Sequence, residues 1–272
     1  MKVYVVGADA TRPSGLLASP YMEKEMRVLG YQPELLSVRD AGGFLKALQN
    51  CAQPDALILC PLSGNLQQDA AYIQAVAQVC QRELEPNEGA MKHLVKRQKL
   101  SQEQAQQLAL LPQDARVFPC HQSALPGFEA AGEGFHIVVM PSDPEEQISL
   151  FFSYLFQILK KASASPCVVR VARVMEMDAA QVEQALAELL DAQSPCVAVY
   201  PKKSEVIVRI CDNSADRSKA AQRCTAALQA VTERLGDCVY GIDVNSIERA
   251  VMAKCAKKNI RLAFAESGTA GL

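Results

Sequence analysis

The strongest constraint on the fold is the alternation of strand and helix patterns along the first 60 residues. Residues 2–6 are β-branched or aromatic and stop at a glycine, which predicts a buried strand followed by a turn. Residues 19–30 begin with Ser-Pro, carry apolar side chains at helical spacing and end in glycine, which is typical of a helix. Strand, helix and strand patterns follow at 33–38, 42–51 and 55–60. This order predicts an α/β domain with a parallel-rich sheet and helices on both faces.

The same domain is expected to continue as far as a linker. After another helix, residues 84–112 are polar and glutamine-rich, and we expect them to be helical and to lie at the surface. Further strands are expected at 115–119 and 135–140, and a long helix that begins with a proline follows them. The tract "KKASASP" (160–166) changes in composition and indicates a linker. The first domain is therefore expected to span residues 1–161.

The pattern after the linker is different. A strand, a helix (178–191), a hairpin and a long helix (214–235) follow one another in the order β-α-β-β-α. This order predicts a small α+β domain over residues 166–243. A further helix and a strand at 261–265 come last, and they are expected to open a third, incomplete domain over residues 244–272.

Composition excludes several classes of partner and site. The formal net charge is −2, so there is no basic surplus for binding a nucleic acid. No window approaches the roughly 20 apolar residues that span a bilayer, so no membrane association is expected. The 10 cysteines form no C-x-x-C pair and the 3 histidines are dispersed, which argues against a structural metal site. We expect a reduced, cytoplasmic protein whose cysteines act mostly as small core residues.

Three loops that follow strands are the candidate binding sites, because ligands of open α/β sheets bind at the carboxyl ends of the strands. These loops, at 7–15, 60–65 and 140–146, are rich in small residues and could bring backbone N–H groups to a phosphate. No dinucleotide-binding or P-loop motif is present, so ordinary strand-to-helix turns are the competing interpretation.

A phosphoryl-transfer site at these loops would need two carboxylates that converge on a divalent metal. Helix capping is the alternative explanation for the three acids at 143–146, because acidic side chains favour the first turn of a helix. The acids near the three loops are Asp9, Asp40, Asp69, Asp143, Glu145 and Glu146.

The last residues of the sequence raise a separate possibility. Ser267 follows a strand pattern on a loop of small residues, with Glu266 beside it, as a serine nucleophile would. A helix-capping serine explains the same spacing, and no partner base is visible.

Taken in order, these segments resemble the CinA family (competence/damage-inducible protein A). "ERLGDCVYGID" (233–243) resembles the end of the family's middle domain, and "CVAVYPKKSEVIVRI" (196–210) resembles the hairpin of that domain. "AFAESGTAGL" (263–272) resembles the family's amidase opening, A-E-S-C-T-G-G-L. Residues 111–128 and 137–147 resemble the stretch that ends in the family's L-P-G-x-P-x-E segment.

The resemblance implies a MoaB-like domain of the nucleotide or molybdopterin type, a KH-like middle domain and the start of a nicotinamide-nucleotide amidase domain. It also implies a homodimer formed through the first domain, and it makes Ser267 the counterpart of the amidase serine. The chain would then be a truncated member, or one that has lost its amidase domain, and no amide hydrolysis is expected. Four residues are expected to contact a nucleotide or dinucleotide: Ser63, Gly64, Asn65 and Ser142.

The first domain departs from the family pattern at its phosphate-side loop, G-G-L-G-P-T-x-D-D. The matching stretch is "CPLSGNLQQ" (60–68), in which Gln67 and Gln68 stand where the family has two aspartates. A neutral amide binds a hard divalent cation far more weakly than a carboxylate does. Asp40 matches one family acid, and Asp69 is placed to replace a lost one.

Three hypotheses for the function follow. The first is a CinA-like protein whose pyrophosphatase site is degenerate and whose first domain serves as a binding or assembly module, with no cofactor. The second is an active metal-dependent pyrophosphatase acting on ADP-ribose or a related dinucleotide, with Asp40 and Asp69 as its acids and a divalent metal as its cofactor. The third is the regulatory front end of a longer nicotinamide-nucleotide amidase.

Overall fold

The computed structural model describes residues 1–8, 16–118, 120–163, 167–192, 194–244 and 246–263. The chain divides into two compact units. Unit 1 comprises Met1–Cys167 and Asp212–Ala220, and unit 2 comprises Val168–Cys211 and Ala221–Leu272. No helix in the described part of the chain is long and apolar enough to cross a membrane.

Unit 1 is built on a six-stranded sheet in the order β2-β1-β3-β8-β7-β6. The pairs formed among the first four strands are parallel, whereas β7 and β6 are antiparallel to their neighbours. The strands are β1 (Lys2–Ala8), β2 (Glu34–Val38), β3 (Ala56–Pro61), β6 (Arg116–Phe118), β7 (Gly127–Ala131) and β8 (Phe135–Met140). The parallel-rich sheet expected from the alternating pattern is therefore present.

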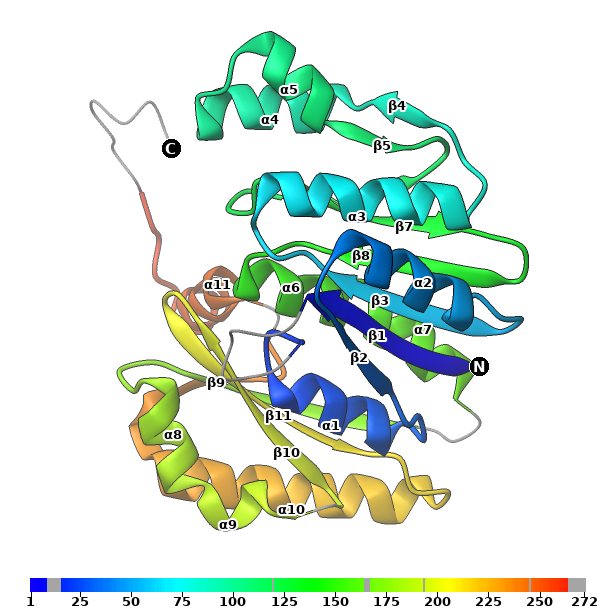
Figure 1. Ribbon diagram of the computed structural model, residues 1–272. Coiled ribbons are helices and arrows are strands. Elements are labelled where there is room, and N and C mark those ends of the chain that lie inside the picture. The colour runs from blue at the N-terminus through cyan, green and yellow to red at the C-terminus, as the bar shows by residue number, and fades with distance from the viewer. Residues whose placement is uncertain (9–15, 119, 164–166, 193, 245, 264–272) are drawn as a thin grey trace. The chain divides into compact units, whose positions relative to one another are not determined.

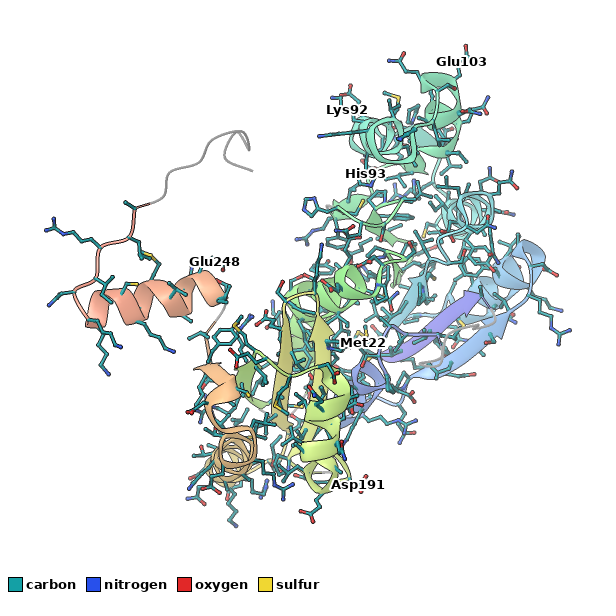
Figure 2. The ribbon with its side chains drawn as sticks, turned by 90° about the vertical axis from the view of Figure 1, so that its left-hand side faces the viewer. Met22, Lys92, His93, Glu103, Asp191 and Glu248 are labelled. Carbon is teal, nitrogen blue, oxygen red and sulfur yellow. The ribbon has the colours of Figure 1, made fainter. Side chains whose placement is uncertain are left out.

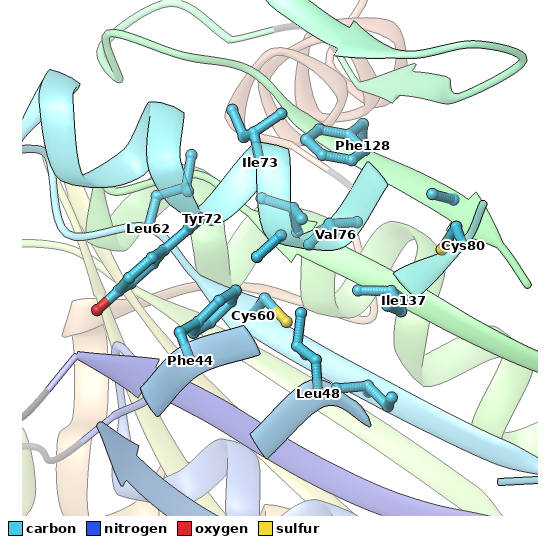
Figure 3. Packing of buried hydrophobic residues seen from close by; sticks show 14 of the residues in the cluster. Phe44, Leu48, Cys60, Leu62, Tyr72, Ile73, Val76, Cys80, Phe128 and Ile137 are labelled. Atoms are coloured by element: carbon cyan, nitrogen blue, oxygen red, sulfur yellow. The ribbon is translucent and has the colours of Figure 1, made fainter. Parts of the chain in front are cut away.

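Helices cover both faces of this sheet (Figure 1). Tyr4 and Val6 of β1 belong to the cluster packed under α2 and α3, and Val5 between them is fully buried on the opposite face. Figure 3 shows that cluster, in which the Phe44 and Tyr72 rings stack with centroids 3.9 Å apart. The helices are α1 (Pro20–Val28), α2 (Ala41–Cys51), α3 (Leu66–Val79), α6 (Pro144–Leu150) and α7 (Phe156–Ala162), with the π-helical turn η1 (Phe151–Leu155) between the last two.

The polar stretch at 84–112 is only partly helical. It forms two helices between two short paired strands: β4 (Leu84–Pro86), α4 (Glu88–Gln98), α5 (Gln102–Leu108) and β5 (Leu110–Pro112). The sequence pattern missed both strands because three residues are too few to show a period of two.

The sequence pattern also missed strand β7 (Gly127–Ala131), whose glycine, alanines and glutamate have low strand propensity. Packing requires its first residue to be glycine. A Cβ atom at Gly127 would lie 2.9 Å from both Pro141 Cδ and the Val139 carbonyl oxygen. Tertiary packing, which a local pattern does not record, therefore fixes this strand.

Unit 2 holds a four-stranded sheet in the order β10-β11-β9-β12. The helix expected at 178–191 is divided into α8 and α9 at Leu186, and strand β12 was not anticipated. Residues 261–263 are not in a strand, and the rest of the strand expected at 261–265 lies outside the described residues. The elements are β9 (Val168–Val174), α8 (Ala179–Ala185), α9 (Ala187–Leu190), β10 (Cys196–Lys202), β11 (Glu205–Asp212), α10 (Arg217–Leu235), the 3₁₀ turn η2 (Gly236–Cys238), β12 (Val239–Ile242) and α11 (Ile247–Lys257).

Candidate functional site

The carboxyl ends of the parallel strands bring the candidate residues of unit 1 to one edge of the sheet. Asp40 follows β2, Ser63 and Gly64 follow β3, and Ser142 follows β8. This is the edge at which open parallel sheets bind their ligands. Of the candidate loop at 7–15, residues 9–15 lie outside the described residues.

Asp69 holds the loop that follows β3. The residue lies in the first turn of α3 and is only 2% exposed. Its Oδ1 accepts hydrogen bonds from the backbone N–H and the hydroxyl of Ser63, each at 2.8 Å. Its Oδ2 accepts a bond from the Gly64 N–H at 2.9 Å. Both oxygens of this carboxylate are therefore engaged with the loop.

The loops after β3 and β8 lie against each other. A Cβ atom built at Gly64 would lie 3.5 Å from both the Cβ and the Oγ of Ser142. The Leu62 N–H also donates to the Met140 carbonyl at 2.9 Å. The structure thus brings together Gly64 and Ser142, two of the four residues expected to bind a nucleotide, and Ser63 is the neighbour of Gly64.

Asn65 caps helix α3. Its side-chain oxygen accepts hydrogen bonds from the N–H groups of Gln67 at 3.1 Å and Gln68 at 3.2 Å. The Asp69 N–H donates to the Asn65 carbonyl at 2.8 Å. Three N–H groups at the start of this helix therefore have acceptors within the protein.

Asp40 performs the same task for helix α2. Its Oδ1 accepts a hydrogen bond of 2.7 Å from the Gly43 N–H. Of the two glutamines that stand in place of acids, Gln68 donates its amide to the Tyr72 hydroxyl at 3.0 Å, and Gln67 is exposed.

The Tyr72 hydroxyl lies near both candidate acids. Burial raises the pKa of Tyr72, the hydrogen bond from Gln68 lowers it, and the negative charges of Asp69 and Asp40 raise it further. Tyr72 is 1% exposed, and Figure 3 shows its hydroxyl directed away from the apolar cluster. The ring therefore belongs to the core, while its hydroxyl accepts a hydrogen bond from Gln68 and is close enough to Asp69 and Asp40 to be affected by their charges.

Glu146 holds a loop that comes 23 to 25 residues earlier in the chain. Its carboxylate accepts hydrogen bonds from three consecutive N–H groups, those of His121, Gln122 (2.8 Å) and Ser123 (3.0 Å). Burial favours a higher pKa, but the bonds from the Ser123 side chain and from these backbone groups lower the pKa of Glu146 below its ordinary value. Asp143 is the helix cap that the sequence suggests, since its Oδ1 accepts from the Glu146 N–H at 3.0 Å.

The fully buried Gln147 links two further segments at this edge. Its Oε1 accepts a hydrogen bond of 2.6 Å from the Ala18 N–H. Its Nε2 donates to the Pro141 carbonyl at 3.1 Å. Sequence reasoning missed the roles of Gln147 and Glu146 because their partners are remote in the chain, and no local pattern marks them.

The described residues contain no group of three His, Cys, Asp or Glu side chains that could hold a metal ion. None of the 10 cysteines, all of which lie in the described part of the chain, forms a disulfide, and 7 of them are buried, as expected of small core residues. Ser267 lies outside the described residues. Four acids lie at the candidate loops, and each accepts hydrogen bonds from backbone N–H groups: Asp40, Asp69, Asp143 and Glu146.

A hollow of about 610 Å³ lies at the opposite edge of unit 1. It is lined by residues at the ends of α2 and α3 and around the β7–β8 turn, among them Cys80, Arg82 and Phe135. Since α2 and α3 run antiparallel to the parallel strands, this hollow lies at the strands' amino ends. It contains none of the residues that the sequence singles out.

Comparison with known proteins tests the resemblance drawn from the sequence. Residues 169–241 match the family model "Damage-inducible protein CinA KH domain". A CinA-like protein of Dictyoglomus turgidum is 28% identical over 165 residues, which cover 60% of this chain and 40% of that protein. A putative competence-damage inducible protein of Clostridium botulinum is 25% identical over 259 residues, which cover 93% of this chain and 63% of that protein.

A solved structure is similar as well. The crystal structure of the protein CinA with unknown function from Thermoplasma acidophilum matches 58% of this chain and 99% of its own, at 17% identity and a TM-score of 0.48. The chain spans between two fifths and two thirds of the length of the curated relatives above. The family-model match and the curated relatives confirm the resemblance drawn from the sequence: residues 169–241 match the CinA KH domain, and the chain is similar to CinA-like and competence-damage inducible proteins.

Proposed function

We propose that unit 1 is a binding module that holds a nucleotide-type ligand at the carboxyl edge of its sheet and does not hydrolyse it. The observation that carries this proposal is the engagement of Asp69. Its buried carboxylate accepts three hydrogen bonds from Ser63 and Gly64, so it serves to hold the loop.

The other groups at this edge are poorly suited to a divalent metal. Such a cation favours carboxylates, and a hydrolytic site uses them to hold metal and activate water. Gln67 and Gln68 are neutral, and Asp40 is used as a helix cap. Asp40, whose Oδ1 already accepts a hydrogen bond from Gly43, gives a far weaker metal site than the pair of aspartates in the family pattern.

The same loops are well suited to binding. Asp69 and Glu146 each hold a loop, and Gln147 links a third segment to Pro141. Loops already held in place lose little conformational entropy when a ligand binds. Ser142 then places a neutral hydroxyl beside Gly64, where the backbone can approach a ligand closely.

The alternative is an active metal-dependent pyrophosphatase that uses Asp40 and Asp69. One observation favours it: Asp40 after β2 and Asp69 in the first turn of α3 lie at the same edge of the sheet, and their charges add to the effect of burial in raising the pKa of Tyr72. The two candidates differ in whether ADP-ribose is bound intact or cleaved.

Calorimetric titration of the 272-residue chain with ADP-ribose in the presence of a chelator tests the proposal. We expect saturable binding that Ser142→Leu weakens by tenfold or more, about 1.4 kcal/mol, because the larger side chain fills the space beside Gly64. Ser153→Leu is the matched control, since Ser153 is exposed on η1, and it should bind like the wild type. Absence of binding, or equal binding by Ser142→Leu, would contradict the proposal.

A further inference from the structure

The segment 84–112, here called the helical segment, packs on the outer side of α3. Five of its residues are buried in the same cluster as Tyr72 and Val76 of α3: Ala90, Leu94, Ala105, Ala109 and Leu111. Its two strands pair with each other and with no strand of the main sheet among the described residues. Because its backbone is not tied into that sheet, the helical segment depends on side-chain contacts for its position.

One of those contacts is polar and reaches the candidate site. His93 Nε2 on α4 lies 2.8 Å from the Ser123 carbonyl oxygen. A carbonyl oxygen can only accept, so His93 donates through Nε2. Figure 2 shows Lys92 directed away from the body of unit 1, whereas the neighbouring His93 lies on the inner side of α4.

Ser123 connects this contact to the loop that carries Ser142. The residue is 3% exposed, and its N–H donates to Glu146 Oε2 at 3.0 Å. Its hydroxyl oxygen accepts a bond of 2.9 Å from the Asp143 N–H, and the hydroxyl also hydrogen-bonds Glu146. A continuous series of hydrogen bonds therefore runs from α4 through Ser123 to the residue that follows Ser142.

We propose that His93 is a positioning residue that couples the helical segment to the ligand loop at 141–143. The proposal rests on the proposed function only in taking Ser142 as a ligand residue. When His93 donates to the Ser123 carbonyl, the Ser123 hydroxyl is held in position to accept from the Asp143 N–H, and Ser142 is thereby held beside Gly64. Both the neutral imidazole with its proton on Nε2 and the imidazolium can donate, so the coupling acts through the hydrogen bond and needs no charge.

Amide hydrogen exchange of the full chain, followed by NMR, tests the coupling. His93→Ala removes the donor, whereas His93→Gln keeps an N–H donor at the same number of bonds from Cα. Lys92→Ala is the matched control on the same helix, since Lys92 is exposed and its ammonium group pairs with Glu88 of that helix. The Asp143 amide is the reporter because it bonds Ser123 and lies remote from α4 in the chain.

We expect His93→Ala to speed exchange of the Asp143 amide on the order of tenfold, and His93→Gln and Lys92→Ala to leave it close to wild type. Ser123→Ala keeps the backbone carbonyl that His93 contacts but removes the hydroxyl. It should speed hydrogen exchange of the Asp143 amide while the amides of α4 stay protected. An unchanged Asp143 amide in His93→Ala would overturn the coupling. Equal acceleration in His93→Ala and His93→Gln would overturn the role of the hydrogen bond.

A ligand titration separates this proposal from the one on which it rests. His93→Ala should weaken ADP-ribose binding roughly fivefold, and His93→Gln should restore it. If the wild-type chain does not bind ADP-ribose, the proposed function fails. The exchange of the Asp143 amide still decides the coupling in that case, because its measurement needs no ligand.

Discussion

The carboxylate of Asp69 accepts hydrogen bonds from both the backbone N–H and the hydroxyl of Ser63, each at 2.8 Å. Asp69 stands one residue after the two glutamines that replace the family's aspartates. From the sequence it could be a substitute metal ligand, but in the structure its hydrogen bonds are those of a residue that holds a loop. Because Asp69 is occupied in this way, we propose that unit 1 binds a ligand and does not hydrolyse it.

Asp69→Ala should therefore lower the free energy of unfolding by roughly 2–4 kcal/mol, because it leaves three donors of Ser63 and Gly64 without their acceptor. Urea denaturation followed by circular dichroism measures this. Gln67→Ala in the same helical turn is the control, since Gln67 is exposed, and its effect should stay within about 0.5 kcal/mol. Equal stability of Asp69→Ala and the wild type would contradict a loop-holding role.

Gly64→Ala should destabilise the protein by about 1–2 kcal/mol. Gly64 has a φ of +89°, which L-residues rarely adopt, and a methyl group would meet Ser142 only at an ordinary contact distance of 3.5 Å. The penalty is thus one of backbone strain. Gly42→Ala should instead stabilise the protein, because Gly42 is exposed and lies in helix α2. Thermal unfolding of both variants and the wild type measures the two effects. A Gly64→Ala variant more stable than the wild type would contradict the predicted backbone strain.

Two substitutions of Asp40 separate the contribution of its negative charge to stability from that of its helix-capping hydrogen bond. Asp40→Ala should lower the free energy of unfolding by about 1 kcal/mol, because the cap on α2 is lost. Asp40→Asn keeps a capping oxygen and should lower it by only about 0.3 kcal/mol. Urea denaturation of both variants checks this. A large loss in Asp40→Asn would mean that the negative charge itself stabilises the fold.

The pH dependence of stability should reveal Glu146. Its pKa is lowered in the folded state, from an ordinary value of 4.5, by hydrogen bonds that outweigh the effect of burial. Its contribution to stability is therefore complete above pH 4.5 and is lost as the pH falls through the lower folded-state value. The difference in unfolding free energy between the wild type and Glu146→Gln should shrink below that pH.

Denaturation curves of both proteins at about pH 3 to pH 7 measure this difference. Glu145→Gln is the control, because Glu145 is exposed in the same first turn of α6. A difference that stays constant with pH would mean that the carboxylate of Glu146 is not preferentially ionised in the folded protein.

The sequence predicts the elements whose signals are local. The Ser-Pro start of α1 is one case, since Ser19 does accept from the Tyr21 N–H at 3.3 Å. The alternation of strands and helices likewise predicts the parallel part of the sheet. Strands β4, β5 and β7 were missed because they are short or weak in strand propensity, and packing against distant residues fixes them.

The candidate site divides in the same way. The loops were found because the carboxyl ends of parallel strands must share an edge, and Gly64 and Ser142 do meet there. The roles of Glu146 and Ser123 could not be predicted, because each depends on a hydrogen bond between segments at least 20 residues apart. Long-range polar contacts of this kind leave no periodic signal in a sequence.

The most direct test of the central claim is AMP release from ADP-ribose by the purified chain, with and without Co²⁺ or Mg²⁺. Asp40→Asn runs alongside, because asparagine keeps the cap of α2 and removes only the charge. If unit 1 binds without hydrolysis, we expect no metal-dependent release above that of Asp40→Asn. Metal-dependent release that falls on the order of tenfold or more in Asp40→Asn would contradict it and would make unit 1 a working pyrophosphatase.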